Sequence, residues 1–349
     1  MTETENLPLL LLMGDATCEN RAVIEAGMET QWRIEEWRRD DPEEKLAALM
    51  AEAHAIVPGG DTLMSGALFR TIGQAVKLKF MQVPFTGVEW LDLSGMPEGC
   101  LVSNAYGHEI AMAEFVIGAM LQMEKDICAI NASFKSGSWK HRAVGVNDFG
   151  QGELCGKTLG IVGFGSIGSE ITKRAKAFDM EVIAVSRSPR ECPDSLEWYG
   201  TMEELPKLLE ESDYVVLACA LNDETRDLLG AEQFELMRDD AVLVNIARGP
   251  VATEEALFNA LKDKQIGGAI LDVWYKYPKG NPPNPDTGGG MPSNFDFGSL
   301  ENVIMSPHCS GNTQATDVRR YLGIATNLDL IANGEEPGNQ VGVGTAPRA

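Results

Sequence analysis

Short apolar runs alternate with amphipathic stretches over the first hundred residues. The runs at 9–13, 55–57 and 78–83 predict strands, and the stretches near 18–26 and 63–69 predict helices. Strands and helices in alternation are typical of a parallel sheet covered by helices. A single long helix is expected from about 108 to 135, because apolar residues recur there at helical spacing.

A second alternating series begins near residue 157 and predicts a doubly wound sheet of six strands. Its expected strands begin with TLGIVGFG and VIAVS, continue with YVVLAC, AVLVNIA and GAILDV, and end at 303–305. The proline- and glycine-rich segment 278–299 predicts a surface loop; the alternative is that this segment covers the active site. One more helix is expected at about 314–332, followed by a glycine-rich tail.

Composition narrows the class of protein. The 349 residues suggest two domains, and the net charge of −23 argues against a nucleic acid or an anionic membrane as partner. The acidic excess fits either a salty habitat or an ordinary acidic cytosolic protein. Seven scattered cysteines without a C-x-x-C pair predict neither a disulfide framework nor a metal site. No apolar stretch approaches the roughly twenty residues of a membrane helix, so we expect a cytoplasmic protein.

The first strand of the second series runs into a G-x-G-x-x-G turn formed by Gly163, Gly165 and Gly168. In this context the three glycines serve a tight turn, close approach of a pyrophosphate, and close packing of helix on strand. The phosphates are expected at the N-terminus of the following helix, near Ser166 and Ile167. The sequence therefore predicts a dinucleotide-binding domain.

The end of the next strand indicates which dinucleotide binds. An NAD site would carry Asp or Glu there, but this chain has Ser186, Arg187 and Ser188, followed by Arg190. A carboxylate would repel a 2′-phosphate, whereas arginine bonds to it and the serine hydroxyls donate. We predict NADP(H) over NAD(H), with a merely solvated loop as the alternative. The hypothesis fails if Arg187→Ala leaves the KM for NADPH unchanged.

The order of further motifs resembles the D-isomer-specific 2-hydroxyacid dehydrogenase family, which includes glyoxylate/hydroxypyruvate reductases and formate dehydrogenase. The resemblance spans nearly the whole chain and includes QVPFTGV at 82–88, GELCGKTLGIVGFGSIG at 152–168, LVNIARGPVATEEAL at 243–257 and NVIMSPHCSGNT at 302–313. It implies an α/β fold of two Rossmann-like domains with doubly wound parallel sheets. It also implies a substrate domain built from both termini (1–106 and 313–349), a cofactor domain at 107–312, and a homodimer.

Reduction of a 2-oxo acid needs a hydride donor, a cation for the carboxylate and an acid for the forming alkoxide. Arg248 follows a strand, at the edge where doubly wound sheets bind ligands, and its planar fork suits a carboxylate. His308 has the intrinsic pKa of an acid/base group working near neutrality. The resemblance places the family's substrate arginine and catalytic histidine on these two positions.

Other positions are assigned through the resemblance, with packing or capping as the alternative for each. For substrate these are Thr86, Gly87, Asn104 and His108. For the cofactor they are Cys219, Ala220, Thr225, Ile246, Ala247 and Asp272. Thr253, where the family more often has Asp, is expected to cap the helix that follows it.

The chain departs from the family pattern at Tyr277. The family usually has a glutamate five residues after the position of Asp272, where it raises the pKa of the catalytic histidine; formate dehydrogenases carry glutamine. We therefore assign Tyr277 to the catalytic set and expect a lower pKa for His308 than is usual for the family. Reduction should then fall off at lower pH, unless a glutamate such as Glu109 supplies the charge.

The sequence thus predicts an NADPH-dependent reductase that converts a small 2-oxo acid, such as glyoxylate or hydroxypyruvate, into a D-2-hydroxy acid. One alternative is a dehydrogenase for an unusual acid, suggested by Tyr277. Another is a cofactor-sensing protein like the corepressors that share this fold. The presence of both Arg248 and His308 argues against the sensor, which needs no carboxylate clamp beside a proton donor.

Overall fold

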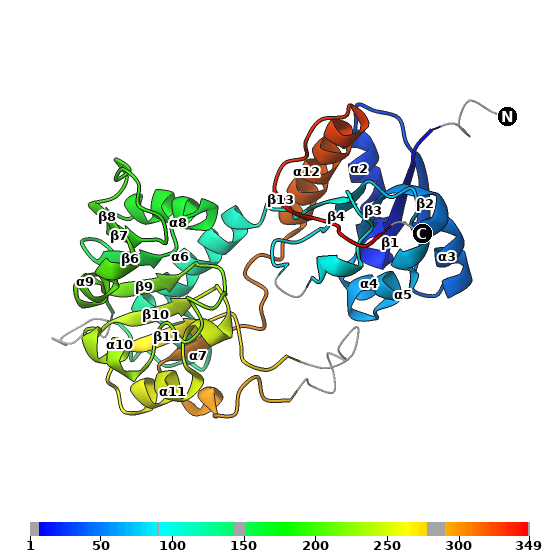
Figure 1. The fold of residues 1–349 in the computed structure, drawn as a ribbon. Coiled ribbons are helices and arrows are strands. Elements are labelled where there is room, and N and C mark those ends of the chain that lie inside the picture. The colour runs from blue at the N-terminus through cyan, green and yellow to red at the C-terminus, as the bar shows by residue number, and fades with distance from the viewer. Residues whose placement is uncertain (1–6, 89–90, 143–150, 278–289, 348–349) are drawn as a thin grey trace. The chain divides into compact units, whose positions relative to one another are not determined.

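The computed structural model describes residues 7–88, 91–142, 151–277 and 290–347. Within them the chain divides into two compact units (Figure 1). The terminal unit consists of the described residues up to 108 and from 313 onward, and the central unit consists of those from 109 to 312. Each unit is built around its own sheet.

The terminal unit holds a six-stranded sheet in the order β13-β5-β4-β3-β1-β2. Its strands are β1 (Leu9–Met13), β2 (Arg33–Trp37), β3 (Ala53–Pro58), β4 (Phe80–Gln82), β5 (Leu101–Ser103) and β13 (Gln340–Val343). Its helices are α1 (Asp15–Glu19), α2 (Arg21–Gly27), α3 (Glu43–Glu52), α4 (Gly60–Met64), α5 (Ala67–Thr71) and α12 (Gln314–Ala332), with η2 (Ile72–Gln74) and η3 (Leu93–Gly95) as short 3-10 turns.

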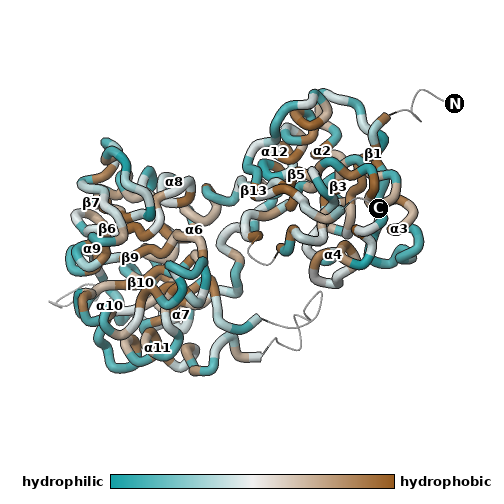
Figure 2. The backbone as a smooth tube through the Cα atoms, in the orientation of Figure 1, coloured by the Kyte–Doolittle hydropathy of each residue, from teal (hydrophilic) through white to brown (hydrophobic). Residues whose placement is uncertain are grey.

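The strand β1 shows why this unit needs helices on both faces. All five of its residues are buried, and successive side chains point to opposite faces of a strand. Leu9, Leu11 and Met13 join a core with residues of α3 and α5, whereas Leu10 and Leu12 join a core with residues of α2 and α12. The strand is correspondingly apolar along its whole length (Figure 2).

The central unit holds a seven-stranded sheet in the order β12-β11-β10-β9-β6-β7-β8, in which every pairing is parallel. Its strands are β6 (Thr158–Val162), β7 (Glu181–Val185), β8 (Trp198–Gly200), β9 (Tyr214–Leu217), β10 (Val242–Asn245), β11 (Gly268–Leu271) and β12 (Val303–Met305). Its helices are α6 (Glu109–Lys125), α7 (Ile127–Lys135), α8 (Ser166–Lys176), α9 (Leu205–Glu211), α10 (Ala231–Leu236) and α11 (Glu254–Lys262), with 3-10 turns η4 (Met202–Glu204), η5 (Gly249–Val251) and η6 (Phe297–Ser299).

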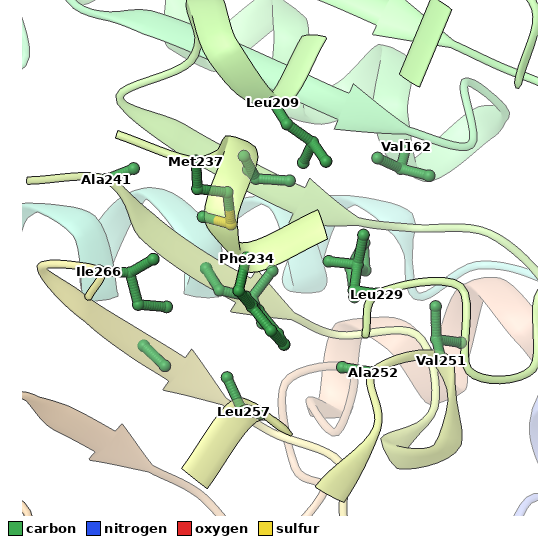
Figure 3. Close-up of a cluster of buried hydrophobic side chains, with 14 of the residues drawn as sticks. Val162, Leu209, Leu229, Phe234, Met237, Ala241, Val251, Ala252, Leu257 and Ile266 are labelled. Atoms are coloured by element: carbon green, nitrogen blue, oxygen red, sulfur yellow. The ribbon is translucent and has the colours of Figure 1, made fainter. Parts of the chain in front are cut away.

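Two apolar cores cover the faces of this sheet. One is formed with α6 and α8, and the other with α9, α10 and α11. In the second core Phe234 of α10 is fully buried and lies among Met237, Leu257 and Ile266 (Figure 3). The predicted α/β class with parallel, helix-covered sheets is confirmed.

Several predicted elements need correction. The helix expected at 108–135 is broken at Asp126, which has φ 46 and ends α6 before α7 begins. The central sheet has seven strands instead of six, because β8 adds an edge strand, and the expected glycine-rich tail contains β13, which pairs antiparallel with β5. Thr253 stands at the N-cap of α11, but its side chain makes no capping hydrogen bond.

Three further elements, β2, β5 and α3, were not expected from the apolar pattern. The predicted loop 278–299 lies largely outside the described residues; its described end includes η6. None of the helices in the described part of the chain is long and apolar enough to cross a membrane.

Candidate active site

The predicted site residues of the central unit follow the carboxyl ends of its parallel strands. Gly163 follows β6, Arg248 lies shortly after β10, Asp272 follows β11, and His308 lies shortly after β12. The neighbours of β6 are β7 on one side and β9 on the other, so the chain reverses its direction of winding there. Such a switch point is where doubly wound sheets bind ligands.

The glycine turn after β6 has the backbone that a dinucleotide site requires. Gly163 has φ +96, and a Cβ built there would lie 2.6 Å from the backbone N and Cα of Cys219, so no larger residue fits. At Gly165 a Cβ would meet nothing within 4 Å, which leaves that face of the loop open. At Gly168 it would lie 3.2 Å from the Gly163 carbonyl oxygen, which reflects the close packing of α8 on β6.

The helix α8 begins at Ser166 directly after this turn. The first N–H groups of a helix have no partner within the helix, and the helix dipole makes its N-terminus attractive to anions. Ser166 is exposed and Ile167 is half-buried. These residues and the open face at Gly165 fit a pyrophosphate.

The two arginines that the sequence assigns to the cofactor, Arg187 and Arg190, have different environments in the segment after β7. Arg190 donates from Nη2 to the Phe164 carbonyl oxygen at 2.9 Å, and its Cζ lies 4.7 Å from the Phe164 ring centroid and 4.8 Å from that of Tyr199. The Tyr199 hydroxyl in turn donates to the Ser188 carbonyl oxygen at 2.7 Å. Arg187 is exposed, and Ser186 is half-buried. Arg190 therefore braces this segment against the glycine turn, and Arg187 is the arginine available to a ligand.

The remaining predicted cofactor residues lie on the loops after β9 and β10. Cys219 is half-buried, and burial raises the pKa of its thiol to about 11. The Thr225 hydroxyl donates to the Ala220 carbonyl oxygen at 2.7 Å, which closes the loop after β9. Ile246 and Ala247 are buried at the end of β10. The structure thus gives Thr225 a bracing contact within its own loop.

A buried asparagine that the sequence analysis did not single out shapes the loop of Arg248. Asn245 donates from Nδ2 to the Arg248 carbonyl oxygen at 3.0 Å and accepts from the Ala247 amide at 3.1 Å. A Cβ at Gly249 would lie 2.4 Å from the Trp274 carbonyl oxygen, so only glycine lets the loops after β10 and β11 touch. The Arg248 side chain is half-buried and donates from Nη1 to the Ala247 carbonyl oxygen at 2.8 Å.

The histidine and the tyrosine of the predicted catalytic set lie against each other. The Tyr277 hydroxyl oxygen is 3.1 Å from His308 Nδ1, and the ring centroids are 5.6 Å apart. The Trp274 amide donates to the same hydroxyl at 3.2 Å. Both side chains remain exposed on one side. Tyr277 thus occupies the position that the resemblance gives to a glutamate.

Electrostatics around His308 favour its neutral form. Partial burial lowers the pKa of His308, the charge of Asp272 opposes this decrease, and the charge of Arg248 adds to it. Burial also raises the pKa of Tyr277, so its hydroxyl keeps its proton near neutral pH. Arg248 is therefore close enough to act on both groups, and Asp272 is a carboxylate whose charge reaches His308.

Asp272 holds the backbone that carries His308. It is fully buried, and its Oδ1 accepts from the Ser306 hydroxyl at 2.6 Å and the Cys309 amide at 2.9 Å, while Oδ2 accepts from the Ser310 amide at 3.0 Å. His308 between these donors has φ 59, a left-handed conformation that costs energy for a residue other than glycine. Asp272 thereby stabilises a strained loop, a role with no signal in the sequence.

The predicted substrate residues of the terminal unit gather around Thr86. The Thr86 hydroxyl donates to the Ala105 carbonyl oxygen at 2.7 Å and lies 3.4 Å from His108 Nδ1, a long contact. Asn104 donates from Nδ2 to the Thr86 carbonyl oxygen at 2.7 Å, while its buried Oδ1 has no partner among the described residues. Gly87, next to Thr86, is half-buried. The structure therefore places the four predicted substrate residues close together in this unit.

Two further features of the described residues bear on the site. No group of three or more His, Cys, Asp or Glu side chains in the described part of the chain could hold a metal ion. The hollow beside Trp37, Arg39 and Arg70 in the terminal unit contains none of the predicted site residues.

Known proteins resemble this chain over most of its length. Residues 117–310, more than half of the chain, match the family model of the D-isomer specific 2-hydroxyacid dehydrogenase, NAD binding domain. The chain is 32% identical to a glyoxylate reductase of Thermococcus gammatolerans over 91% of this chain and 92% of the relative. It is 33% identical to a D-3-phosphoglycerate dehydrogenase of Methanocaldococcus jannaschii, of which it spans half the length.

Among solved structures, the fold is similar to a D-isomer specific 2-hydroxyacid dehydrogenase family protein of Aeromonas salmonicida, with a TM-score of 0.78 and 24% identity. That match covers 97% of this chain and 99% of the other. An NADPH-dependent glyoxylate/hydroxypyruvate reductase of Sinorhizobium meliloti, solved with NADP and sulfate, gives a TM-score of 0.73 at 22% identity over 96% of this chain and 98% of the other.

The family match and the relatives define an NAD(P)-dependent oxidoreductase that acts on CH–OH groups. The chain belongs to the D-isomer-specific 2-hydroxyacid dehydrogenase family.

Proposed function

We propose that this protein reduces a small 2-oxo acid to the D-2-hydroxy acid with NADPH. The observation that carries the proposal is the pairing of a cation with a proton donor: Arg248 and His308 follow neighbouring parts of one sheet edge and interact electrostatically. A carboxylate clamp beside an acid/base group is what a 2-oxo acid requires. A protein that only senses its cofactor needs neither.

In the proposed reaction Arg248 binds the substrate carboxylate through its planar fork and orients the keto group. His308 holds its transferable proton on Nε2, because Nδ1 faces Tyr277. The nicotinamide cofactor, when bound, supplies the hydride. As the carbonyl carbon is reduced, His308 gives the Nε2 proton to the forming alkoxide, and Asp272 keeps the loop of His308 in place.

The cofactor preference rests on the segment after β7. Arg187 is exposed beside Ser186 and Ser188, and no Asp or Glu stands among residues 186–190. A 2′-phosphate would gain charge-assisted hydrogen bonds there, whereas the ribose of NADH would lack its usual carboxylate partner. The S. meliloti reductase, which shares this fold, is itself NADPH-dependent.

The substrate class follows from the relatives and from the terminal unit. Glyoxylate reductases of Thermococcus and Pyrococcus species resemble the chain over 91% of its length, which favours glyoxylate or hydroxypyruvate. We assign Thr86, Gly87, Asn104 and His108 to the substrate. Asn104 Oδ1, buried and without a partner among the described residues, marks this cluster as one where a polar ligand or a water completes the hydrogen bonding.

The test is the initial rate of NADPH oxidation, and separately of NADH oxidation, with glyoxylate, hydroxypyruvate, pyruvate, phenylpyruvate and 2-oxoglutarate. Arg248→Lys keeps the charge but removes the planar fork, and should raise KM for the acid. His308→Gln should remove turnover while NADPH still binds. Tight NADPH binding without turnover of any of these acids by the unmodified protein would contradict the reductase and favour a sensor.

We also propose a homodimer that uses α7. Although α7 (Ile127–Lys135) is rich in apolar residues, none of them is buried within the chain, and Ile127, Phe134 and the nearby Trp139 are each more than half exposed. An apolar face of this kind usually marks a protein interface. Light scattering should give twice the mass of one chain, and Phe134→Ser combined with Trp139→Ser should give a monomer. A monomeric unmodified protein would refute the dimer.

A further inference from the structure

The contact between Tyr277 and His308 differs chemically from the carboxylate contact that the family pattern leads one to expect. A carboxylate only accepts hydrogen bonds, so it always keeps the histidine proton on the facing nitrogen. A phenol both accepts and donates. The tyrosine therefore leaves open which nitrogen of a neutral imidazole carries the proton.

The surroundings of the Tyr277 hydroxyl indicate whether Nδ1 or Nε2 of neutral His308 carries the proton. The Trp274 amide already donates to its oxygen at 3.2 Å. The hydroxyl proton remains, and in the described part of the chain the acceptor within hydrogen-bond distance is His308 Nδ1, at 3.1 Å. If Nδ1 carried a proton, it would donate to the same phenol oxygen as the Trp274 amide, and the tyrosine proton would lose Nδ1 as its acceptor.

We propose that the Tyr277 hydroxyl donates to Nδ1 of neutral His308 and thereby places the single imidazole proton on Nε2, the nitrogen available to the substrate. Tyr277 is thus a positioning residue that sets the tautomer of the acid/base group. The raised pKa of Tyr277 supports this, because its hydroxyl keeps the proton that it donates near neutral pH. The lowered pKa of His308 supports it too, because the neutral ring is the form in which a tautomer exists.

The consequence for catalysis rests on the proposed function. In reduction, the charged imidazole gives its Nε2 proton to the alkoxide oxygen as the hydride adds to the carbonyl carbon, and the choice of tautomer does not arise. In oxidation, the Nε2 lone pair must take the hydroxyl proton while the hydride leaves for NADP⁺. A neutral His308 with its proton on Nε2 has no lone pair there and is an unproductive base.

Tyr277 should therefore lower the alkaline plateau of 2-hydroxy acid oxidation and leave the acidic plateau of 2-oxo acid reduction unchanged. The oxidation plateau lies at alkaline pH and the reduction plateau at acidic pH. A change in one plateau alone therefore does not alter the equilibrium constant of the reaction. One net hydrogen bond changes an equilibrium by about two- to tenfold. The oxidation plateau should thus be about two- to tenfold below that of a variant in which the proton is fixed on Nδ1.

The direct test is the ¹⁵N spectrum of the full-length protein with labelled histidine, recorded without substrate above the pKa of His308. The chain has four histidines, and His308→Gln assigns the signal of interest. In the unmodified protein Nε2 should carry the proton and Nδ1 the lone pair. Tyr277→Glu should reverse this pattern, and Tyr277→Phe, which removes only the hydroxyl, should decrease the ratio of the Nε2–H to the Nδ1–H form about two- to tenfold.

The matched control is Tyr275→Phe. The Tyr275 hydroxyl donates to the Ala252 carbonyl oxygen at 2.8 Å instead of to His308, so its removal should leave the tautomer unchanged. A proton on Nδ1 in the unmodified protein would overturn the proposal, and so would an unchanged ratio in Tyr277→Phe. Because the spectrum needs no turnover, an Nε2–H signal in a protein that reduces no 2-oxo acid would refute the proposed function and leave the tautomer assignment standing.

Discussion

Replacing Asp272 with asparagine tests how the loop of His308 is held. The carboxylate is fully buried and accepts three hydrogen bonds, two on Oδ1 and one on Oδ2. An amide of the same shape has one accepting oxygen. In its better orientation it keeps the bonds from Ser306 and Cys309 as neutral ones, and its NH₂ group then faces the Ser310 amide, which is also a donor.

The magnitude follows from these contacts. A buried donor left without a partner costs about 1–3 kcal/mol, and each charge-assisted bond that becomes neutral loses roughly 1 kcal/mol more. Asp272→Asn should therefore lower the free energy of unfolding by about 3–5 kcal/mol, a large part of the 5–15 kcal/mol typical of a folded protein. It should also shift the decline of reduction to lower pH, because the charge that opposes the decrease in the pKa of His308 is gone.

The assay is urea unfolding followed by circular dichroism, with linear extrapolation to water. Asp194→Asn, an exposed aspartate of the same unit, is the matched control and should change stability by less than about 0.5 kcal/mol. A loss below about 1 kcal/mol for Asp272→Asn would refute the reasoning, because it would mean that the three hydrogen bonds do not hold the loop.

Three further outcomes are expected. Arg187→Ala should raise KM for NADPH roughly tenfold and leave KM for NADH unchanged. The control Arg238→Ala, whose side chain forms an ion pair with Asp213, should change neither KM. Equal effects of Arg187→Ala on both cofactors would contradict the 2′-phosphate assignment. Gly163→Ala should lower the free energy of unfolding by at least about 1–3 kcal/mol, measured by denaturation, because it forces a Cβ into the loop after β9. Gly165→Ala should keep the stability but lose affinity for NADPH, measured by titration. Reduction needs the charged imidazole, so a lowered pKa of His308 should make kcat/KM decline with rising pH earlier than for a histidine at about 6.5; a profile flat past about pH 8 would exclude this.

The interior strands of both sheets could be predicted from the sequence because parallel strands covered on both faces are continuous apolar runs. The residues of β1 and of β9 are all buried, and both strands lie inside their sheets. The missed strands are mostly at sheet edges. Only one residue of β2 is buried and none of β8 or β13, so their sequences carry no apolar run.

The helix that breaks at Asp126 shows a different limit of sequence reasoning. The apolar spacing continues from α6 into α7, yet the backbone at Asp126 turns left-handed. Aspartate adopts that conformation more readily than most residues, but it also occurs inside helices. The break could not be predicted from the pattern alone.

Some parts of the candidate site could likewise be predicted from the sequence, and others could not. The glycine turn, Arg248 and His308 have local signals, and the register that puts Tyr277 opposite His308 could be counted along the chain. The three donors to Asp272 lie 34 to 38 residues away, and the stacking of Arg190 on Tyr199 depends on the path of β8. Contacts between loops that follow different strands appear only once the sheet has been assembled.

The position of α12 and β13 in the chain sets an order for folding during synthesis. The strands of the central sheet, β6 to β12, follow one another along the chain with no described strand of the terminal unit between them, so a ribosome delivers them in succession. The sheet of the terminal unit is begun first and finished last, because β13 and the residues of α12 that cover Leu10 and Leu12 emerge only after the whole central unit. Until then the part of the leucine face that α12 covers is exposed to water and to other nascent chains, and a chaperone that binds apolar surfaces could protect it.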